Sequence, residues 1–112
     1  MAKPILRSYS RYTHEGITLL AKLIRTARMD RKLTTTDVAE RAGISRGLLQ
    51  RIEKGDPKCE IGAFFEVATI VGIKLFNSDE KSISKLIDQV DDKLTLLPKS
   101  VRKKVKAVDD DF

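Results

Sequence analysis

The sequence predicts a small all-α protein, and three observations point to that class. Apolar residues recur at three- and four-residue steps through most of the 112-residue chain. Capping residues and glycines stand where such helices would begin and end. No segment shows the two-residue alternation of a β-strand. We therefore expect an N-terminal arm over residues 1–12, one helical domain over 13–76, and a C-terminal helical segment over 77–112.

The composition narrows the classes of protein that the chain can be. With 41% hydrophobic and 34% charged residues it reads as an ordinary globular protein. No apolar run reaches the roughly 20 residues of a membrane span, and the N-terminus lacks the plan of a secretory signal, so we expect a cytoplasmic, nucleoid-associated protein. The chain has one cysteine, Cys59, and one histidine, His14. They cannot form an internal disulfide bond or a set of zinc ligands, so we expect neither a metal nor a cofactor. The net charge of +6 favours a polyanionic partner without identifying it.

The first expected helix runs from Thr13 to about Asp30. Thr13 is the expected N-cap, because its hydroxyl can accept from an unpaired amide of the first turn. The apolar positions that repeat at helical spacing are Ile17, Leu20, Leu23, Ile24 and Ala27.

Two short helices with a tight turn between them follow. Thr34 opens the first of them and forms a capping box with Asp37, although Glu or Gln is usual at that place. Gly43 offers the left-handed conformation that ends this helix. Ser45 then caps the next helix, and Gly55 stops it.

Two further helices complete the expected fold. The fourth runs from about Glu60 to Val71 and is ended by Gly72. The fifth starts near Ser78 and carries apolar residues that either pack on the domain or bury against a second copy, and we expect a homodimer. These residues are Ile83, Leu86, Ile87, Val90, Leu94 and Leu97. After Pro98 we expect a short basic helix with Val101, Val105 and Val108, and then an acidic end at residues 109–112.

The third helix leaves its outer face polar, because Ile52 and either Leu48 or Leu49 face inward. A helix of this width fits the major groove of DNA, where arginine can pair with guanine and glutamine with adenine. Hydroxyls at helix N-termini attract phosphate. The residues that we expect to contact DNA are Thr34, Thr35, Ser45, Arg46, Gly47, Gln50, Arg51, Lys54 and Lys58. For each polar side chain, a merely solvated position is the alternative.

An enzyme is not expected from this sequence. It shows no paired nucleophile and base, no recognisable pair of carboxylates, no metal set and no phosphate loop. Cys59 fits a small packed hydrophobe better than a nucleophile.

The region from Ile17 to Phe76 resembles the Xre or lambdoid-repressor class of helix-turn-helix domains. The resemblance is carried by LTTTDVAERAGISRGLLQRIEKG and EIGAFFEVATIVGI. It implies a five-helix bundle, and an ion pair between Arg28 and Glu53 that orients the recognition helix. The sequence departs from the class at Thr35, where many members have Gln, and at Cys59, where proline is common.

A narrower resemblance concerns RIEKGDPKCEIGAFFEVATIVGIKLF and LLPKSVRKKVKAVDDDF, which look like HipB-like antitoxins. It implies a dimer that binds a palindromic operator, represses its own operon and holds a HipA-like kinase toxin inactive. Two other functions remain open on the same scaffold: a solitary regulator without a toxin, and a protein-interaction adaptor that no longer reads DNA.

Overall fold

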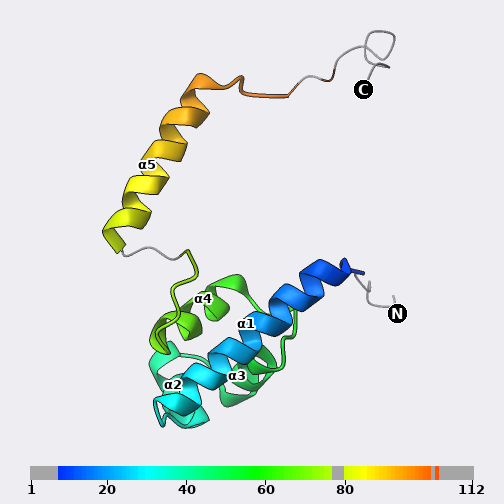
Figure 1. The fold of residues 1–112 in the computed structure, drawn as a ribbon, viewed down its shortest axis with the longest axis vertical. Coiled ribbons are helices and arrows are strands. Elements are labelled where there is room, and N and C mark those ends of the chain that lie inside the picture. The colour runs from blue at the N-terminus through cyan, green and yellow to red at the C-terminus, as the bar shows by residue number, and fades with distance from the viewer. Residues whose placement is uncertain (1–7, 77–79, 102, 104–112) are drawn as a thin grey trace. The chain divides into compact units, whose positions relative to one another are not determined.

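The computed structural model describes residues 8–76, 80–101 and 103. Within these ranges the chain forms five α-helices and no β-strand, which confirms the all-α fold (Figure 1). The helices are α1 (Arg11–Asp30), α2 (Thr35–Ala42), α3 (Arg46–Glu53), α4 (Ile61–Ile70) and α5 (Glu80–Leu96). The chain divides into two units, residues 1–77 with α1 to α4 and residues 78–112 with α5. Four helices therefore lie in the region for which the resemblance implied five, and the fifth belongs to the second unit.

Helix α1 begins two residues earlier than the sequence predicted. Ser10 is its N-cap, and the Ser10 Oγ accepts the backbone N–H of Thr13 at 3.2 Å. The expectation that Thr13 itself is the cap was wrong, because Ser10 is the cap and Thr13 is already the third residue of the helix. Arg11 and Tyr12 consequently belong to the helix and not to the expected arm, whose residues 1–7 lie outside the described part of the chain.

Helix α1 ends at Asp30 as predicted, but the way in which this end is capped was not predicted. The Lys32 N–H donates to the carbonyl of Met29 at 2.9 Å, and the Leu33 N–H donates to the carbonyl of Arg28 at 3.1 Å. This pair of bonds is the Schellman motif, which needs a left-handed residue and usually has glycine there. Here Lys32 takes that conformation, with φ of 57°.

The predicted caps of α2 and α3 are confirmed. The Thr34 hydroxyl accepts from the Asp37 amide at 3.0 Å, while the Thr34 amide donates to the Asp37 carboxylate at 2.9 Å. Gly43 ends α2 in the left-handed region with φ of 68°. Ser45 caps α3 by accepting from the Leu48 amide at 3.0 Å.

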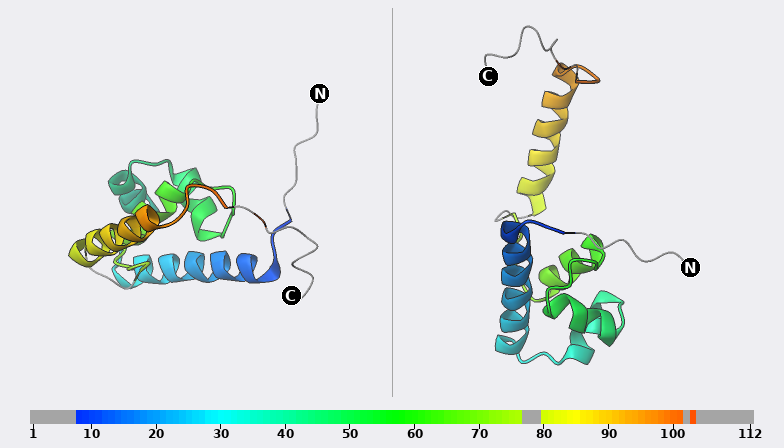
Figure 2. Two further views of the ribbon diagram at one scale, coloured as in Figure 1. Left: turned by 90° about the horizontal axis from the view of Figure 1, so that it is seen from above. Right: turned by 90° about the vertical axis from the view of Figure 1, so that its right-hand side faces the viewer.

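The core of the first unit is built from one face of each of the four helices. Helix α2 packs against α3 and α4, and α1 packs against α3. Figure 2 shows α1 running along one side of the other three helices in both views. The largest side chains that are completely or almost completely buried are Ile24, Val38, Leu49, Ile52, Val67 and Val71. Because α3 is held from the inside by α1 and α2, its opposite face is left for other contacts.

Helix α5 forms close to the predicted position and ends two residues before Pro98. Within its own unit no described element covers the apolar stripe. Residues 97–101 and 103 are not helical, and the remainder of the expected basic helix and the acidic end lie outside the described residues. None of the described helices is both long enough and apolar enough to cross a membrane.

Candidate nucleic-acid interface

Two buried side chains fix the rotation of α3 about its axis. Leu49 and Ile52 are both 0% exposed and lie three residues apart, so they share the inner face of the helix. Leu48 is only half-buried, which settles the alternative that the sequence left between Leu48 and Leu49. With the inner face fixed in this way, the side chains that point outward are determined.

The connection between α2 and α3 is a tight turn of three residues, Gly43 to Ser45. The N–H of Ile44 donates to the carbonyl of Ala39 at 3.0 Å, and the Ile44 side chain is half-buried at the turn. The two helices are therefore separate elements joined by a turn with its own hydrogen bonds.

The outer face of α3, here called the recognition face, consists of exposed residues. They are Arg46, Gly47, Gln50, Arg51 and Lys54. Arg46 and Gln50 are four residues apart and therefore lie one above the other on the helix surface. An α-helix with its side chains is about 10–12 Å in diameter, and a major groove about 12 Å wide admits such a helix. A Cβ added to Gly47 would meet only the Ser45 Oγ, at 3.9 Å, so the protein's own packing does not demand glycine there.

At the N-termini of α2 and α3, some of the hydrogen-bonding groups are already occupied within the protein. The hydroxyls of Thr34 and Ser45 each accept a backbone amide, and the Ser45 hydroxyl retains its own hydrogen to donate. The Asp37 carboxylate accepts the Thr34 amide, and this bond, followed by the one with the Thr34 hydroxyl, holds the pKa of Asp37 below its ordinary value. Thr35 is half-buried. A phosphate at the start of α2 would thus meet a carboxylate, whereas the start of α3 carries none.

A partly buried ion pair ties α3 to α1. Arg28 Nε lies 2.7 Å from one carboxylate oxygen of Glu53, and its Nη2 lies 3.1 Å from the other. The remaining Nη1 donates to the Leu33 carbonyl at 2.9 Å. The two side chains are 12% and 8% exposed. Arg28 of α1 is thereby bound both to α3 and to the turn between α1 and α2. The ion pair joins Arg28 and Glu53, the two residues that the resemblance indicated.

A second ion pair was missed by the sequence analysis. Arg51 Nε donates to Asp56 Oδ2 at 2.9 Å, and the Lys58 amide donates to Asp56 Oδ1 at 2.9 Å. Bonding by Asp to the amide two residues on is the usual Asx-turn pattern, and the Gly-Asp-Pro sequence carries that signal. The contact with Arg51, five residues earlier, has no comparable sequence signal.

The recognition face and its surroundings are predominantly basic. Among the described residues, the side chains of Arg46, Lys54 and Lys58 have no ion-pair partner within 4.0 Å. Nearby, burial raises the pKa of the Cys59 thiol, which therefore stays protonated near neutral pH and is a poor nucleophile. Within the described ranges, no three His, Cys, Asp or Glu side chains gather to hold a metal ion.

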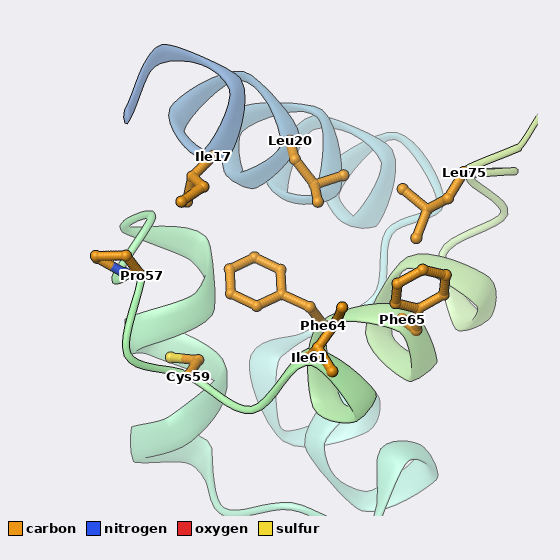
Figure 3. A pocket seen from close by; sticks show the side chains of 8 residues that line it. All are labelled: Ile17, Leu20, Pro57, Cys59, Ile61, Phe64, Phe65 and Leu75. Atoms are coloured by element: carbon orange, nitrogen blue, oxygen red, sulfur yellow. The ribbon is translucent and has the colours of Figure 1, made fainter. Parts of the chain in front are cut away.

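A separate groove of about 340 Å³ lies between α1, the α3–α4 loop and α4. In Figure 3, Ile17 and Leu20 of α1 point toward the ring of Phe64 across this groove. The other residues that line it are Pro57, Cys59, Ile61, Phe65 and Leu75. None of its lining side chains in the described part of the chain is charged, so the groove suits an apolar group and not a phosphate.

The comparison with protein families agrees with this geometry. Residues 19–72 match the family model described as a helix-turn-helix domain. No curated protein and no solved structure matches the chain significantly. The matched region begins within α1 and ends just after α4, so it spans the two capped helices and the core that holds them. Residues 19–72 are therefore similar to helix-turn-helix domains, and α2 and α3 have the two helices and the tight turn by which such domains bind DNA.

Proposed function

We propose that the protein is a sequence-specific DNA-binding repressor that inserts α3 into the major groove of its operator. The observation that carries this proposal is the division of α3 into two faces. Leu49 and Ile52 anchor it in the core, while Arg46 and Gln50 are exposed at its N-terminal half. In helix-turn-helix proteins the N-terminal residues of this helix contact base edges.

The chemistry of the exposed side chains supports direct reading of bases. Arg46, which has no ion-pair partner among the described residues, has a guanidinium fork that can donate twice to guanine, and Gln50 can pair with adenine. Gly47 lies between them and leaves room for the backbone to approach the duplex. The neighbouring Lys54 and Lys58 add phosphate neutralisation that does not depend on sequence.

Selection from a random duplex library, followed by binding titrations, tests this proposal. Arg46→Ala should weaken binding to the selected duplex by about 1–3 kcal/mol and relax the preference at one base pair. Arg25→Ala is the matched control, because Arg25 is an exposed arginine of α1 outside the recognition face. Equal losses in the two variants would show that only net charge matters. Failure of the wild-type protein to bind any duplex at modest salt would favour the adaptor function.

We also propose that the protein acts as a homodimer joined through α5. The core of the stripe is Ile83, Ile87, Val90, Leu94 and Leu97, with alternating steps of four and three residues. This is the spacing of a coiled-coil seam. Ile87, Val90 and Leu94 are each more than half exposed within the chain, more apolar surface than a single appended helix normally presents.

Light scattering on the full chain tests the dimer. Replacing Ile87 and Leu94 together by Asp should give monomers, because two charges would be buried in the seam. Replacing Lys85 and Gln89 by Asp on the same helix is the control, since both are exposed and lie off the seam. A dimer mass that survives the first pair of changes would place the interface elsewhere.

The antitoxin role is the most specific part of the proposal. It is supported by the resemblance of residues 51–76 and 96–112 to HipB-like antitoxins, and by the presence of an apolar groove that could receive protein side chains. A HipA-like kinase expressed from a neighbouring gene should form a complex of defined stoichiometry with the full chain and lose kinase activity. If the kinase activity is unchanged at a saturating concentration of this chain, the antitoxin role is contradicted and the solitary regulator is favoured.

A further inference from the structure

Arg51 stands on the recognition face but is not free to extend from it. Its Nε donates to the Asp56 carboxylate at 2.9 Å, and about half of its side chain is exposed. Asp56 follows the end of α3, so the contact draws the guanidinium toward the α3–α4 loop. That direction leads away from the N-terminal half of α3, where base contacts are made in this class of domain.

Asp56 is itself fixed by the loop. Its second oxygen accepts the Lys58 amide at 2.9 Å, and its own amide donates to the carbonyl of Arg51 at 3.0 Å. The side chain is 28% exposed. One carboxylate therefore connects the last turn of α3 to the loop that carries Lys58, and it uses a different oxygen for each contact.

The surface beside this carboxylate is a shallow depression with a basic edge. Gly47, Arg51 and Lys58 line it, and Glu60 is the one acidic residue among its described lining residues. Four of the five N–H donors of Arg51 remain on its two terminal nitrogens, and the Lys58 ammonium has no ion-pair partner among the described residues. In the depression, the N–H donors of Arg51 and Lys58 can therefore bind the same anion.

We propose that Asp56 is a positioning residue that assigns Arg51 to the DNA backbone, where Arg51 and Lys58 together bind one phosphate and Arg51 reads no base. The inference rests on the proposed DNA-binding function and differs from the alternative in which Arg51, as an arginine of the recognition face, pairs with guanine. It divides the recognition face into a base-reading half, Arg46 to Gln50, and a phosphate-binding end.

The ionisation of the Asp56 carboxyl group supports a contact with Arg51 that persists at neutral pH. The Lys58 amide, and after it Arg51, lowers the pKa of Asp56 below its ordinary value. The carboxylate is therefore ionised throughout the neutral range, and the position of Arg51 does not depend on pH there.

Titrations of the selected duplex and its single-base variants at several salt concentrations test the proposal. Arg51→Ala should reduce the slope of log affinity against log salt by about 0.9, and weaken all base variants by the same factor. The affinity difference from wild type should therefore shrink roughly three- to fourfold between about 50 and 200 mM salt. Arg51→Lys should restore the slope, because a phosphate contact needs the charge and not the fork.

The positioning role of Asp56 is measured by a double-mutant cycle. Asp56→Asn removes the charge but keeps an oxygen for the Lys58 amide, and thermal unfolding confirms that each variant is folded. Arg51→Ala should change the salt slope by about 0.9 in the wild-type background and clearly less in the Asp56→Asn background. Equal changes in both backgrounds would overturn the positioning role.

Two other outcomes separate the proposals from each other. A loss of preference at one base pair in Arg51→Ala, with the salt slope unchanged, would make Arg51 a base reader and overturn this inference alone. A wild-type protein that selects no duplex would overturn the proposed function, and this inference with it.

Discussion

The backbone conformation of Lys32 reduces the stability of the folded chain. Its φ of 57° lies in the left-handed region, which a residue with a Cβ adopts at a cost of about 1–2 kcal/mol. Lys32→Gly should therefore raise the free energy of unfolding by about 0.5–1 kcal/mol, part of the gain being offset by the freedom of glycine in the unfolded chain. Denaturant titration measures this change. Lys32→Ala, which retains a Cβ, should give no such gain; if it did, conformation would not be the cause.

Asp37 makes the stability of the domain depend on pH in a defined direction. Its folded-state pKa lies below the ordinary value of 3.8, so the folded state binds this proton less readily than the unfolded state. The contribution is complete above 3.8 and is lost as the pH falls through the lower folded-state pKa. Denaturation of wild type and Asp37→Asn should differ most above 3.8 and converge in stronger acid. A difference that grows on acidification would contradict this account.

Apart from the cap Ser10, residues that act within one turn were predictable from the sequence, whereas the conformation of Lys32 and the contact of Arg51 were not. Thr34, Ser45 and Gly43 were placed correctly because caps and left-handed glycines have local chemical causes. Lys32 was missed because its conformation is imposed by the path of the chain between α1 and α2. The Arg51–Asp56 contact was missed because it depends on how the loop turns back after α3.

At the scale of helices, the Arg28–Glu53 pair connects α3 to α1 and to the turn before α2. Glu53→Ala alone should destabilise the domain by about 3 kcal/mol, because Arg28 would remain partly buried without its partner. Replacing both residues by Met should restore much of that stability, since apolar pairs often substitute well for buried ion pairs. Thermal and denaturant unfolding measure both variants.

The DNA affinity of the double variant then tests whether the pair orients α3. If it does, the variant should regain stability but bind the selected duplex more weakly than wild type, and discriminate less between its single-base variants. Full affinity and discrimination in a stable double variant would reduce the pair to a structural role.

The helices themselves were largely predictable, and their starts less so. Amphipathic periodicity located all five helices, because each buries one face or carries one apolar stripe. The start of α1 was placed two residues too late, because the first turns of that helix are exposed and carry no apolar signal before Ile17. The five-helix arrangement implied for residues 17–76 instead has four helices followed by a turn.

At the scale of the whole molecule, the proposed dimer sets the form of the operator. Two-fold symmetry requires two inverted half-sites, with centres about one helical turn apart. Binding to the full operator should weaken strongly in the Ile87→Asp, Leu94→Asp variant, whereas binding to an isolated half-site should change little. Titration of both duplexes with that variant measures this. Equal losses on the two duplexes would mean that the changes damage the unit that contains α3 itself.

The central claim is that α3 enters the duplex by the face opposite Leu49 and Ile52. Backbone amide shifts of the labelled full chain, recorded during titration with the selected duplex, test it most directly. The account predicts the largest changes at the start and outer face of α3, from Ser45 to Arg51, with smaller changes at Lys58 and little change in the first turns of α1. Changes confined to other elements, with the amides of α3 unmoved at saturation, would contradict it.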